Sequence, residues 1–521
     1  MAVDTVLSAL NDVLPDYTLI RDCIAGQRQI KSKRETYLPH PDMGEPDPVA
    51  RKDRFDAYIG RAVFYGVTGR TLRGLVGMVF DKDPAVEAPD RLKPVLEDAT
   101  GSGTSLDQQA MASLREVVGI GRGGLLTDYP KTTGPVTVAE ANAGNMRPTI
   151  VRYAAEDIIN WRSKAVGAKM MKTLVVLRET YVVEDDGFAE VTGTQYRVLR
   201  LENGIYTVEI HRNTDAAGLS PFEKFTPLDG KGFPFNEIPF EFIGAEDNDP
   251  SVDPSPLLDL AELNVAHYRN SADYEESAFL VGQPTPVFAG LTKQWVDEVF
   301  TQERDDGHGN KTKRAVIRLG SRAAVPLPQG GSAELLQADP NSIAFEAMEH
   351  KEKQMIALGA KLIENTGTQQ TATESTQDVI MDNSVLGVCA RNVSMAYRKA
   401  LNWAWQFMTG EIVDDPDVID YELNTDFASR TLTAEDRAEI IREWQGKAIT
   451  WEEMRWNLKR SGVAYEDDEE AKAAIQSETE ASIEMEALAA NALGQATGQV
   501  DEQGNPVPKP TPGKKAPPNA E

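Results

Sequence analysis

The segment that most constrains the fold lies between residues 253 and 410. Its pattern predicts a helix, a short β-rich insert, a second helix, a small polar loop and then one very long helix. The first helix follows Pro254 and Pro256, and its apolar residues recur at spacings of three, four and seven. These residues are Leu257, Ala261, Val265, Tyr268, Ala272 and Phe279. This order of elements favours the wall of a channel over an enzyme active site.

Charged residues of the first helix fall on a stripe beside the apolar one, at 100° per residue. They are Asp259, Glu262, Asp273 and Glu276, interrupted by Arg269. Leu260, Leu263 and Tyr274 form a second apolar edge. A helix of this kind can pack between identical neighbours and expose carboxylates to a lumen, so the five charged residues are candidates for lining a channel. The pattern also fits an ordinary amphipathic helix on a globular core.

The second helix has one apolar and one charged half. The apolar half holds Ile343, Phe345, Ala347, Met348, Met355, Ile356, Leu358, Leu362 and Ile363. The charged half holds Glu346, Glu349, His350, Lys353 and Lys361. We add Glu349 and Lys353 to the channel-lining candidates.

The long helix is predicted to begin at the capping box Thr371-Ala372-Thr373-Glu374 and to end near Met408, with Gly410 as a left-handed stop. At about 1.5 Å per residue it would exceed about 50 Å, with Gly387 as its bend. Trp403, Trp405 and Phe407 are predicted to anchor the core.

Two short features are candidates for contact with DNA or a partner. The loop before the long helix is polar and uncharged, so it can form hydrogen bonds with DNA without binding phosphates tightly. It comprises Asn365, Thr366, Gly367, Thr368, Gln369 and Gln370. The densest basic cluster of the insert is Lys311, Lys313 and Arg314, which could meet phosphates or an acidic partner. A plain interhelical turn and a solvated hairpin tip fit the two features as well.

The flanking segments have simpler patterns. Residues 1–253 combine helices, including one near 51–77 and one at 105–118, with alternating β runs from residue 151. Asn203-Gly204 signals a hairpin between two of these runs. Residues 433–494 are helical in pattern, with a capping box at Thr450-Trp451-Glu452-Glu453, and disorder is predicted beyond residue 495.

Composition excludes several classes of function. With 82 acidic and 54 basic residues, the net charge of −28 argues against tight binding of duplex DNA, which requires cations to neutralise phosphates. An acidic lining is compatible with DNA that slides past. The two cysteines, Cys23 and Cys389, have no metal-ligand spacing. No apolar run reaches the roughly 20 residues that span a bilayer, so no membrane contact is expected.

No motif for catalysis or cofactor binding is found. Residues 119–124 spell G-x-G-x-x-G, but they come after a helix and before a strand, which is the reverse of a dinucleotide site. The sequence contains no phosphate-binding P-loop, no metal-ligand spacing among its five histidines and no nucleophile elbow. We therefore expect no enzyme activity, no cofactor and no metal.

Several stretches, taken in order, resemble the portal proteins of tailed bacteriophages, specifically a subgroup long catalogued as a family of unknown function. They are YIGRAVFYGVTGRTLRGLVGMVF from Tyr58, GRGGLLTDYP from Gly121, LLDLAELNVAHYRNSADYE from Leu257, GQPTPVFAG from Gly282 and TATESTQDVIMDNSVLGVCARNVSMAYRKALNWAW from Thr371. The number, order and spacing of these stretches carry the resemblance.

The resemblance implies an α+β protomer of a ring of about twelve copies at one capsid vertex of a virion. Its regions would be a mixed wing (1–253), a stem helix (254–281), a β-containing clip (282–340), a second stem helix (341–364), a tunnel loop (365–371), a long wing helix with its return segment (372–432), a helical crown (433–494) and a disordered tail (495–521). The implied partners are the major capsid protein, the terminase large subunit, a head–tail adaptor protein and double-stranded DNA. Assembly would occur in the host cytoplasm. Another phage head protein, such as a minor capsid or scaffold component, and a head-associated hydrolase are the alternatives.

Overall fold

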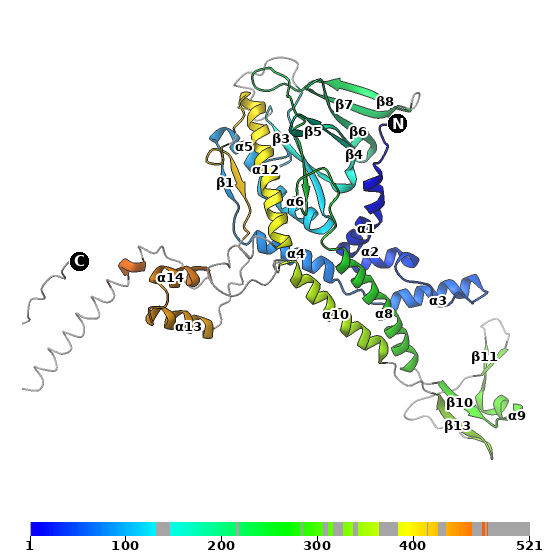
Figure 1. Ribbon diagram of the computed structural model, residues 1–521. Coiled ribbons are helices and arrows are strands. Elements are labelled where there is room, and N and C mark those ends of the chain that lie inside the picture. Colours follow the sequence, from blue (N-terminus) through cyan, green and yellow to red (C-terminus); the bar gives the residue numbers. More distant parts are fainter. Residues whose placement is uncertain are drawn as a thin grey trace, which may run out of the picture. The chain divides into compact units, whose positions relative to one another are not determined.

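The computed structural model describes residues 2–131, 146–214, 218–282, 285–305, 311–315, 327–336, 342–363, 384–413, 415–425, 434–460, 471–474 and 477 (Figure 1). It forms two compact units, Met1–Phe427 and Ala428–Glu521. The first unit combines helices with antiparallel sheets, as the predicted α+β class requires.

Five helical elements open the described part of the chain, and Tyr17 and Ile20 of the first are fully buried. These elements are α1 Ser8–Ala25, α2 Gln27–Ser32, η1 Arg34–Thr36, α3 Pro48–Arg61 and α4 Val67–Val79. The single helix predicted near 51–77 was wrong, because α3 and α4 are separate. Side chains satisfy the backbone at the break: the Val63 N–H donates to Ser271 Oγ (3.1 Å) and the Phe64 N–H to Gln27 Oε1 (3.0 Å).

A helix-to-strand turn at Gly121 joins α6 Leu106–Ile120 to β2 Arg122–Asp128. Ser105 and Gln108 form a capping box at the start of α6, and Gly121 ends it with φ of 90°. The predicted order of helix, turn and strand is confirmed, but the turn is confined to Gly121, because Gly119 lies in α6 and Gly123 and Gly124 lie in β2. β2 is the middle strand of an antiparallel sheet, between β3 Thr149–Ala154 and β9 Phe240–Gly244.

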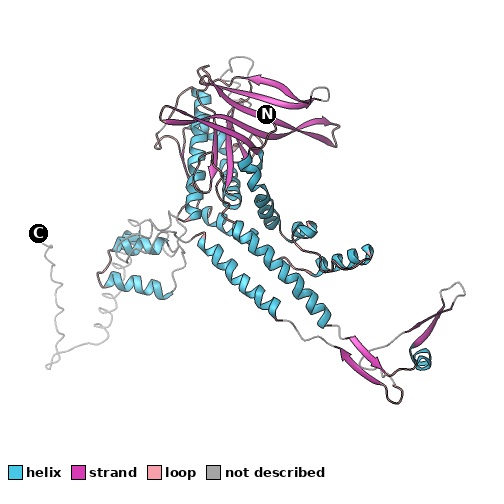
Figure 2. Ribbon diagram, turned by 45° about the vertical axis from the view of Figure 1, so that its right-hand side comes forward, coloured by secondary structure: helices cyan, strands magenta, loops and turns pink. Residues whose placement is uncertain are grey.

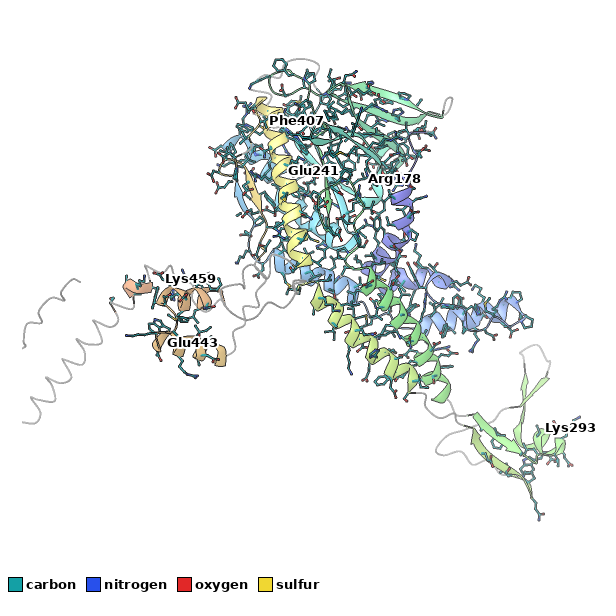
Figure 3. All side chains as sticks on the ribbon, viewed as in Figure 1. Arg178, Glu241, Lys293, Phe407, Glu443 and Lys459 are labelled. Carbon is teal, nitrogen blue, oxygen red and sulfur yellow. The ribbon has the colours of Figure 1, made fainter. Side chains whose placement is uncertain are left out.

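A second, five-stranded sheet is an antiparallel meander (Figure 2). Its strands are β4 Ile158–Val166, β5 Lys169–Asp185, β6 Glu190–Glu202, β7 Ile205–Thr214 and β8 Gly218–Phe225. The predicted hairpin at Asn203-Gly204 is confirmed, with φ of 53° and 77°. Glu241 of β9, labelled in Figure 3, links the two sheets and α12, since its carboxylate pairs with Lys172 of β5 (2.5 Å) and Lys399 of α12 (2.9 Å).

The long helix predicted from residue 372 is not continuous. α12 spans Val385–Thr409, and Ser384 before it has an extended backbone, with φ of −70° and ψ of 153°. The Ser384 side chain accepts a hydrogen bond from the Gly387 N–H (3.0 Å), so the helix starts here and Gly387 is in its first turn, not at a central bend. The capping box at 371–374 lies outside the described residues. The stop at Gly410 is confirmed, with φ of 68°.

The C-terminal half of α12 packs into the core as predicted. Trp403 and Phe407 are almost fully buried, and Trp405 is partly buried against the same cluster. The Phe407 ring (labelled in Figure 3) lies 4.3 Å from that of Phe235 between centroids. The aromatic residues near the end of this helix therefore serve packing.

The remaining elements of the first unit are short, apart from α8 and α10. They are β1 Ala85–Glu87, which pairs with β14 Asp420–Glu422; η2 Asp90–Leu92; α5 Lys93–Glu97; η3 Ala155–Asp157; α8 Leu258–Val281; β10 Thr285–Ala289, which pairs with β13 Ser332–Leu336; α9 Lys293–Trp295; η4 Val296–Phe300; β11 Thr301–Asp305, which pairs with β12 Lys311–Ala315; and α10 Ile343–Lys361.

The described part of the second unit contains α13 Ala434–Gln445 and α14 Trp451–Arg460. The predicted capping box is confirmed: the Thr450 N–H donates to Glu453 Oε2 (2.6 Å) and the Glu453 N–H to Thr450 Oγ1 (3.1 Å). Most of residues 461–494, which are also helical in pattern, and the tail beyond residue 495 lie outside the described residues.

Candidate channel-facing helix pair

The helices α8 and α10 lie side by side and antiparallel (Figures 1 and 2). Tyr274 of α8 lies near Phe345 at the start of α10, with ring centroids 5.8 Å apart. Asn270 accepts a hydrogen bond from Lys351 (3.0 Å), and His267 lies 3.3 Å from Glu352. Going from Tyr274 back to His267 on α8, the contacting residues on α10 run forward from Phe345 to Glu352. The two helices therefore run in opposite directions.

The predicted apolar stripe of α8 packs against the body of the first unit. Five of its six members are buried: Leu257, Ala261, Val265, Tyr268 and Ala272. The sixth, Phe279, is 43% exposed, and the Arg61 guanidinium stacks 4.4 Å from its ring. Buried Asn264 adds polar links, since its amide donates to the Tyr65 carbonyl (2.6 Å) and accepts from Thr68 Oγ1 (3.0 Å). These contacts hold the first half of α8 rigidly on the body.

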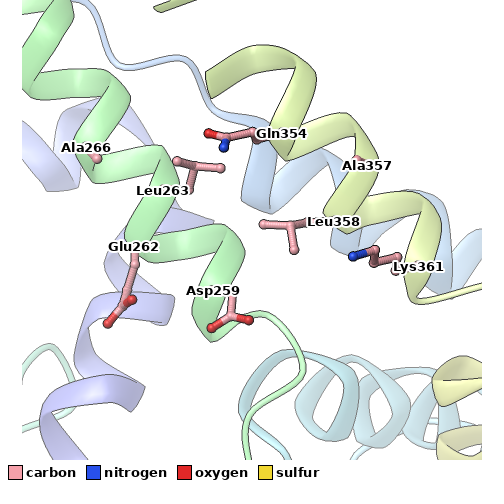
Figure 4. A pocket seen from close by; sticks show the side chains of 8 residues that line it. All are labelled: Asp259, Glu262, Leu263, Ala266, Gln354, Ala357, Leu358 and Lys361. Atoms are coloured by element: carbon pink, nitrogen blue, oxygen red, sulfur yellow. The ribbon is translucent and has the colours of Figure 1, made fainter. Parts of the chain in front are cut away.

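A groove of about 590 Å³ separates the start of α8 from the end of α10 (Figure 4). Its lining residues are Asp259, Glu262, Leu263, Ala266, Gln354, Ala357, Leu358 and Lys361. Asp259, Glu262 and Lys361 are exposed. The polar groups that line the groove are the carboxylates of Asp259 and Glu262, the amide of Gln354 and the amine of Lys361, and none of the eight residues is a histidine, cysteine, serine or threonine. Gln354 and Lys361 were absent from the channel-lining candidates, although Lys361 was placed on the charged half of its helix.

The second half of the predicted charged stripe of α8 contacts the segment 37–61 of the same chain. Arg269 Nε donates to the Tyr37 carbonyl (2.9 Å), and Asp273 accepts a hydrogen bond from the Tyr58 hydroxyl (2.5 Å). Burial and this hydrogen bond raise the pKa of Tyr58 above its ordinary value. Arg269 and Asp273 nevertheless stay exposed.

Glu276 requires a correction. It is 9% exposed, and its carboxylate pairs with Arg54 (3.1 Å) and with Arg61. A buried carboxylate with two cationic partners presents little charge to solvent. We therefore remove Glu276 from the channel-lining candidates.

On α10, Glu349 and Lys353 are exposed, as a lining position requires. The predicted apolar half is only partly buried: Met355 is 1% exposed, but Ile343 and Ile356 are 73% and 72% exposed. An apolar half would be expected to lie in the core, but within this chain Ile343 and Ile356 remain in solvent.

The other candidate residues have no described side chains. Residues 365–370 lie wholly outside the described residues. Lys311, Lys313 and Arg314 belong to β12, which pairs with β11 in a hairpin, and only their backbone is described.

His267 is the most unusual titratable group between the two helices. It is 2% exposed, and its Nδ1 has no hydrogen-bond partner. Burial lowers the pKa of His267 below its ordinary value, although the hydrogen bond and charge of Glu352 oppose the shift. Burial between α8 and α10 therefore favours the neutral form of this imidazole.

Across the described parts of the chain, no three His, Cys, Asp or Glu side chains come together as metal ligands would. Both cysteines are buried and free of a disulfide, and their thiols donate to the carbonyls of Ala261 and Ala245. None of the described helices has an apolar stretch sufficient to cross a bilayer.

Comparison with known families places one match on this region. Residues 256–408 match the family model described as "Domain of unknown function (DUF4055)". The matched segment contains α8, α10 and α12 and amounts to less than a third of the chain. No curated protein matches the sequence.

Solved structures similar to this chain include three from gene transfer agent particles. A chain of the "Virion of native gene transfer agent (GTA) particle" is 12% identical with a TM-score of 0.36, and the match covers 84% of this chain and 99% of that one. The "Neck of native GTA particle computed with C12 symmetry" has the same identity and TM-score over 83% and 98% of the two chains. The "Neck of empty GTA particle computed with C6 symmetry" again has 12% identity and a TM-score of 0.36, over 80% and 95%. At this TM-score the likeness does not establish a shared fold.

Proposed function

We propose that this chain is the subunit of a phage portal ring, a channel at one capsid vertex through which the genome is packaged and ejected. The observation that carries the proposal is the antiparallel pair of α8 and α10, which is joined through a small β-containing insert and exposes charged residues from both helices. The ordered sequence stretches that resemble portal proteins support it independently.

In the proposed ring, α8 and α10 of each copy line the lumen. Asp259, Glu262, Asp273 and Glu349 supply negative charge, and Arg269, Lys353 and Lys361 interrupt it. DNA affinity depends on cations that displace counterions from phosphates, so a wall with an excess of carboxylates over cations holds the duplex weakly. A wall of this kind lets DNA slide in both directions, because attractive contacts would slow translocation.

The other regions take the roles that follow from this arrangement. Residues 1–253 and α12 form the wing, residues 282–340 the clip and residues 433–494 the crown. The tunnel loop at 365–370 touches DNA in the lumen through uncharged side chains. Lys311, Lys313 and Arg314 in the clip offer positive charge to the terminase large subunit or, later, to a head–tail adaptor. The chain performs no catalysis in this role, and the packaging motor is a separate protein.

Electron microscopy of the purified protein tests the proposal directly. We expect closed rings of about twelve copies with a central hole wide enough for duplex DNA. Only monomers and dimers at every concentration, or an assembly in which α8 and α10 lie away from the central axis, would contradict it.

Deletion of residues 365–370 separates a portal from another head protein. If the chain lines the channel, the deletion variant still assembles rings but packages or retains less DNA. If the chain is instead a minor capsid or scaffold component, the deletion variant packages as much DNA as the wild type. Deletion of residues 500–505 from the predicted tail is a control of equal length.

A further inference from the structure

Strand β5 carries hairpin turns of opposite charge at its two ends. It spans Lys169–Asp185 and is connected to β4 at one end and to β6 at the other. At about 3.3 Å per residue the two turns lie roughly 50 Å apart. One continuous strand separates the two turns, so they do not meet within one copy.

The turn between β5 and β6 is an acidic and apolar end, which we call the acidic tip (residues 182–191). Its charged residues are Glu184, Asp185, Asp186 and Glu190, and it contains no lysine or arginine. Phe188 is fully exposed, and Val182, Val183 and Val191 are each about half exposed. Solvent-exposed apolar residues concentrated in this way mark an interaction site.

The acidic tip also presents unpaired backbone. The pairing of β5 with β4 ends at Leu177, and the pairing of β6 with β7 begins at Gln195. Within the described residues, the tip is therefore a two-stranded ribbon with both edges open, a feature that folded chains usually cover or pair.

The turn between β4 and β5 is a basic and apolar end, which we call the basic tip (residues 162–170). Arg162, Lys164 and Lys169 are exposed, and this segment contains no aspartate or glutamate. Val166 is 54% exposed and Met170 is 70% exposed. No ion pair within the described part of the chain involves these three cations, or the four carboxylates of the acidic tip.

We propose that the acidic tip of one copy docks on the basic tip of a second copy of this chain. The two surfaces match in charge and both contain apolar residues, so the contact combines electrostatic pairing with burial of Phe188 and Met170. A twofold contact of either tip with itself would bring like charges together, which disfavours it. The contact is head-to-tail, and repeated head-to-tail contacts close into a ring when the rotation allows.

The closure of these contacts into a ring rests on the proposed function, whereas the pairing of the two tips does not.

Three variants of the full chain test the pairing: Glu184→Lys with Glu190→Lys in the acidic tip, Lys164→Glu with Lys169→Glu in the basic tip, and all four changes together. Asp185 and Asp186 are left unchanged, because their carboxylates accept hydrogen bonds from the backbone of the turn. Asp12→Lys with Glu87→Lys, at exposed positions on α1 and β1, is a control whose charge change equals that of the acidic-tip variant.

The measurement is the concentration at which half the protein assembles, by mass photometry or sedimentation in 50 and 500 mM salt. Each two-residue tip variant should raise this concentration by about tenfold or more at low salt, and the four-residue variant should restore assembly. The difference from wild type should shrink at high salt. Circular dichroism should show all variants folded, since the changed side chains are exposed.

Two results would overturn the inference: assembly unchanged in both tip variants, or assembly lost in both and not restored in the four-residue variant. If rings form normally in every variant but fail to enter capsids, the tips bind a different partner and the pairing of copies is wrong. Failure of the proposed function is a separate result, because in that case wild-type protein forms no ring with a central hole.

Discussion

The imidazole of His267 on α8 lies 3.3 Å from the carboxylate of Glu352 on α10, and its other ring nitrogen is buried without a hydrogen-bond partner. The two helices proposed to line the channel thus meet at a buried imidazole whose pKa lies below its ordinary value.

Because burial lowers the pKa of His267 in the folded chain, the unfolded chain binds its proton more readily. Stability contributed by the neutral imidazole is present above the ordinary pKa of 6.5 and is lost as the pH falls through the window down to the lowered value. We expect the free energy of unfolding to drop between pH 7.5 and pH 5 in wild-type protein, and to drop less in His267→Gln. Urea unfolding at several pH values measures this.

His350, exposed on α10, is the matched control, and His350→Gln should keep the wild-type pH dependence. If His267→Gln and wild type lose stability in parallel, His267 does not supply this pH dependence.

Gly121 lies where the turn after α6 packs on the start of α8. Its φ is 90°, and an added Cβ would lie 2.8 Å from the Pro254 carbonyl oxygen. Gly103 has a similar φ of 85° with open space around it. Gly103→Ala should therefore cost about 1 kcal/mol from backbone strain alone, and Gly121→Ala at least about 3 kcal/mol because a clash with backbone is added. Thermal and urea unfolding compare the two, and equal losses would show that the contact with Pro254 relaxes freely.

Arg197 is the centre of a partly buried ion-pair network. It contacts Glu179 at 2.7 Å and Asp128 at 3.0 Å, with no more than about a fifth of each side chain exposed. Arg197→Met would leave two carboxylates without their cation, so we expect a loss of about 2–4 kcal/mol in the free energy of unfolding.

Arg178 (Figure 3) offers the comparison, because it pairs with Asp157 at 3.1 Å while both side chains are about 40% exposed. Arg178→Met should cost less than about 1 kcal/mol. If Arg197→Met and Arg178→Met lose similar amounts of free energy of unfolding, burial does not make the Arg197 ion pairs more important for stability than the Arg178 pair.

The acidic wall predicts the effect of charge reversal on DNA binding. Asp259→Lys with Glu262→Lys should increase the affinity of rings for duplex DNA at low salt, steepen its salt dependence and slow packaging. Fluorescence anisotropy with a labelled duplex measures the affinity. The pair Asp12→Lys with Glu87→Lys changes the net charge equally, and an equal gain in that control would assign the effect to net charge.

Local patterns in the sequence were sufficient for many of the elements. Three local features were predicted from residue type: the cap at Thr450, the stop at Gly410 and the hairpin at Asn203-Gly204. The cap at Ser105 is of the same kind, because each of these features involves residues within a few positions of one another. The breaks before α4 and α12 were not predicted. The first depends on Gln27 and Ser271, which are distant in sequence and satisfy the backbone there.

The candidate site divides in the same way. The stripe analysis placed Asp259 and Glu262 on an exposed face correctly, because helical periodicity alone decides which residues share a face. It could not show that Glu276, at the other end of the same stripe, would pair with Arg54 and Arg61 of α3.

The sequence by itself determined the α+β class, the two helices flanking an insert, the buried stripe of α8 and the absence of a recognisable catalytic motif, since periodicity, capping residues and composition act locally. Only the tertiary structure decided which charges remain free, where the helices break and that β5 holds an acidic and a basic tip far apart. The physical reason is that exposure and ion pairing depend on which distant segments pack together, and a pattern along one segment does not specify its neighbours.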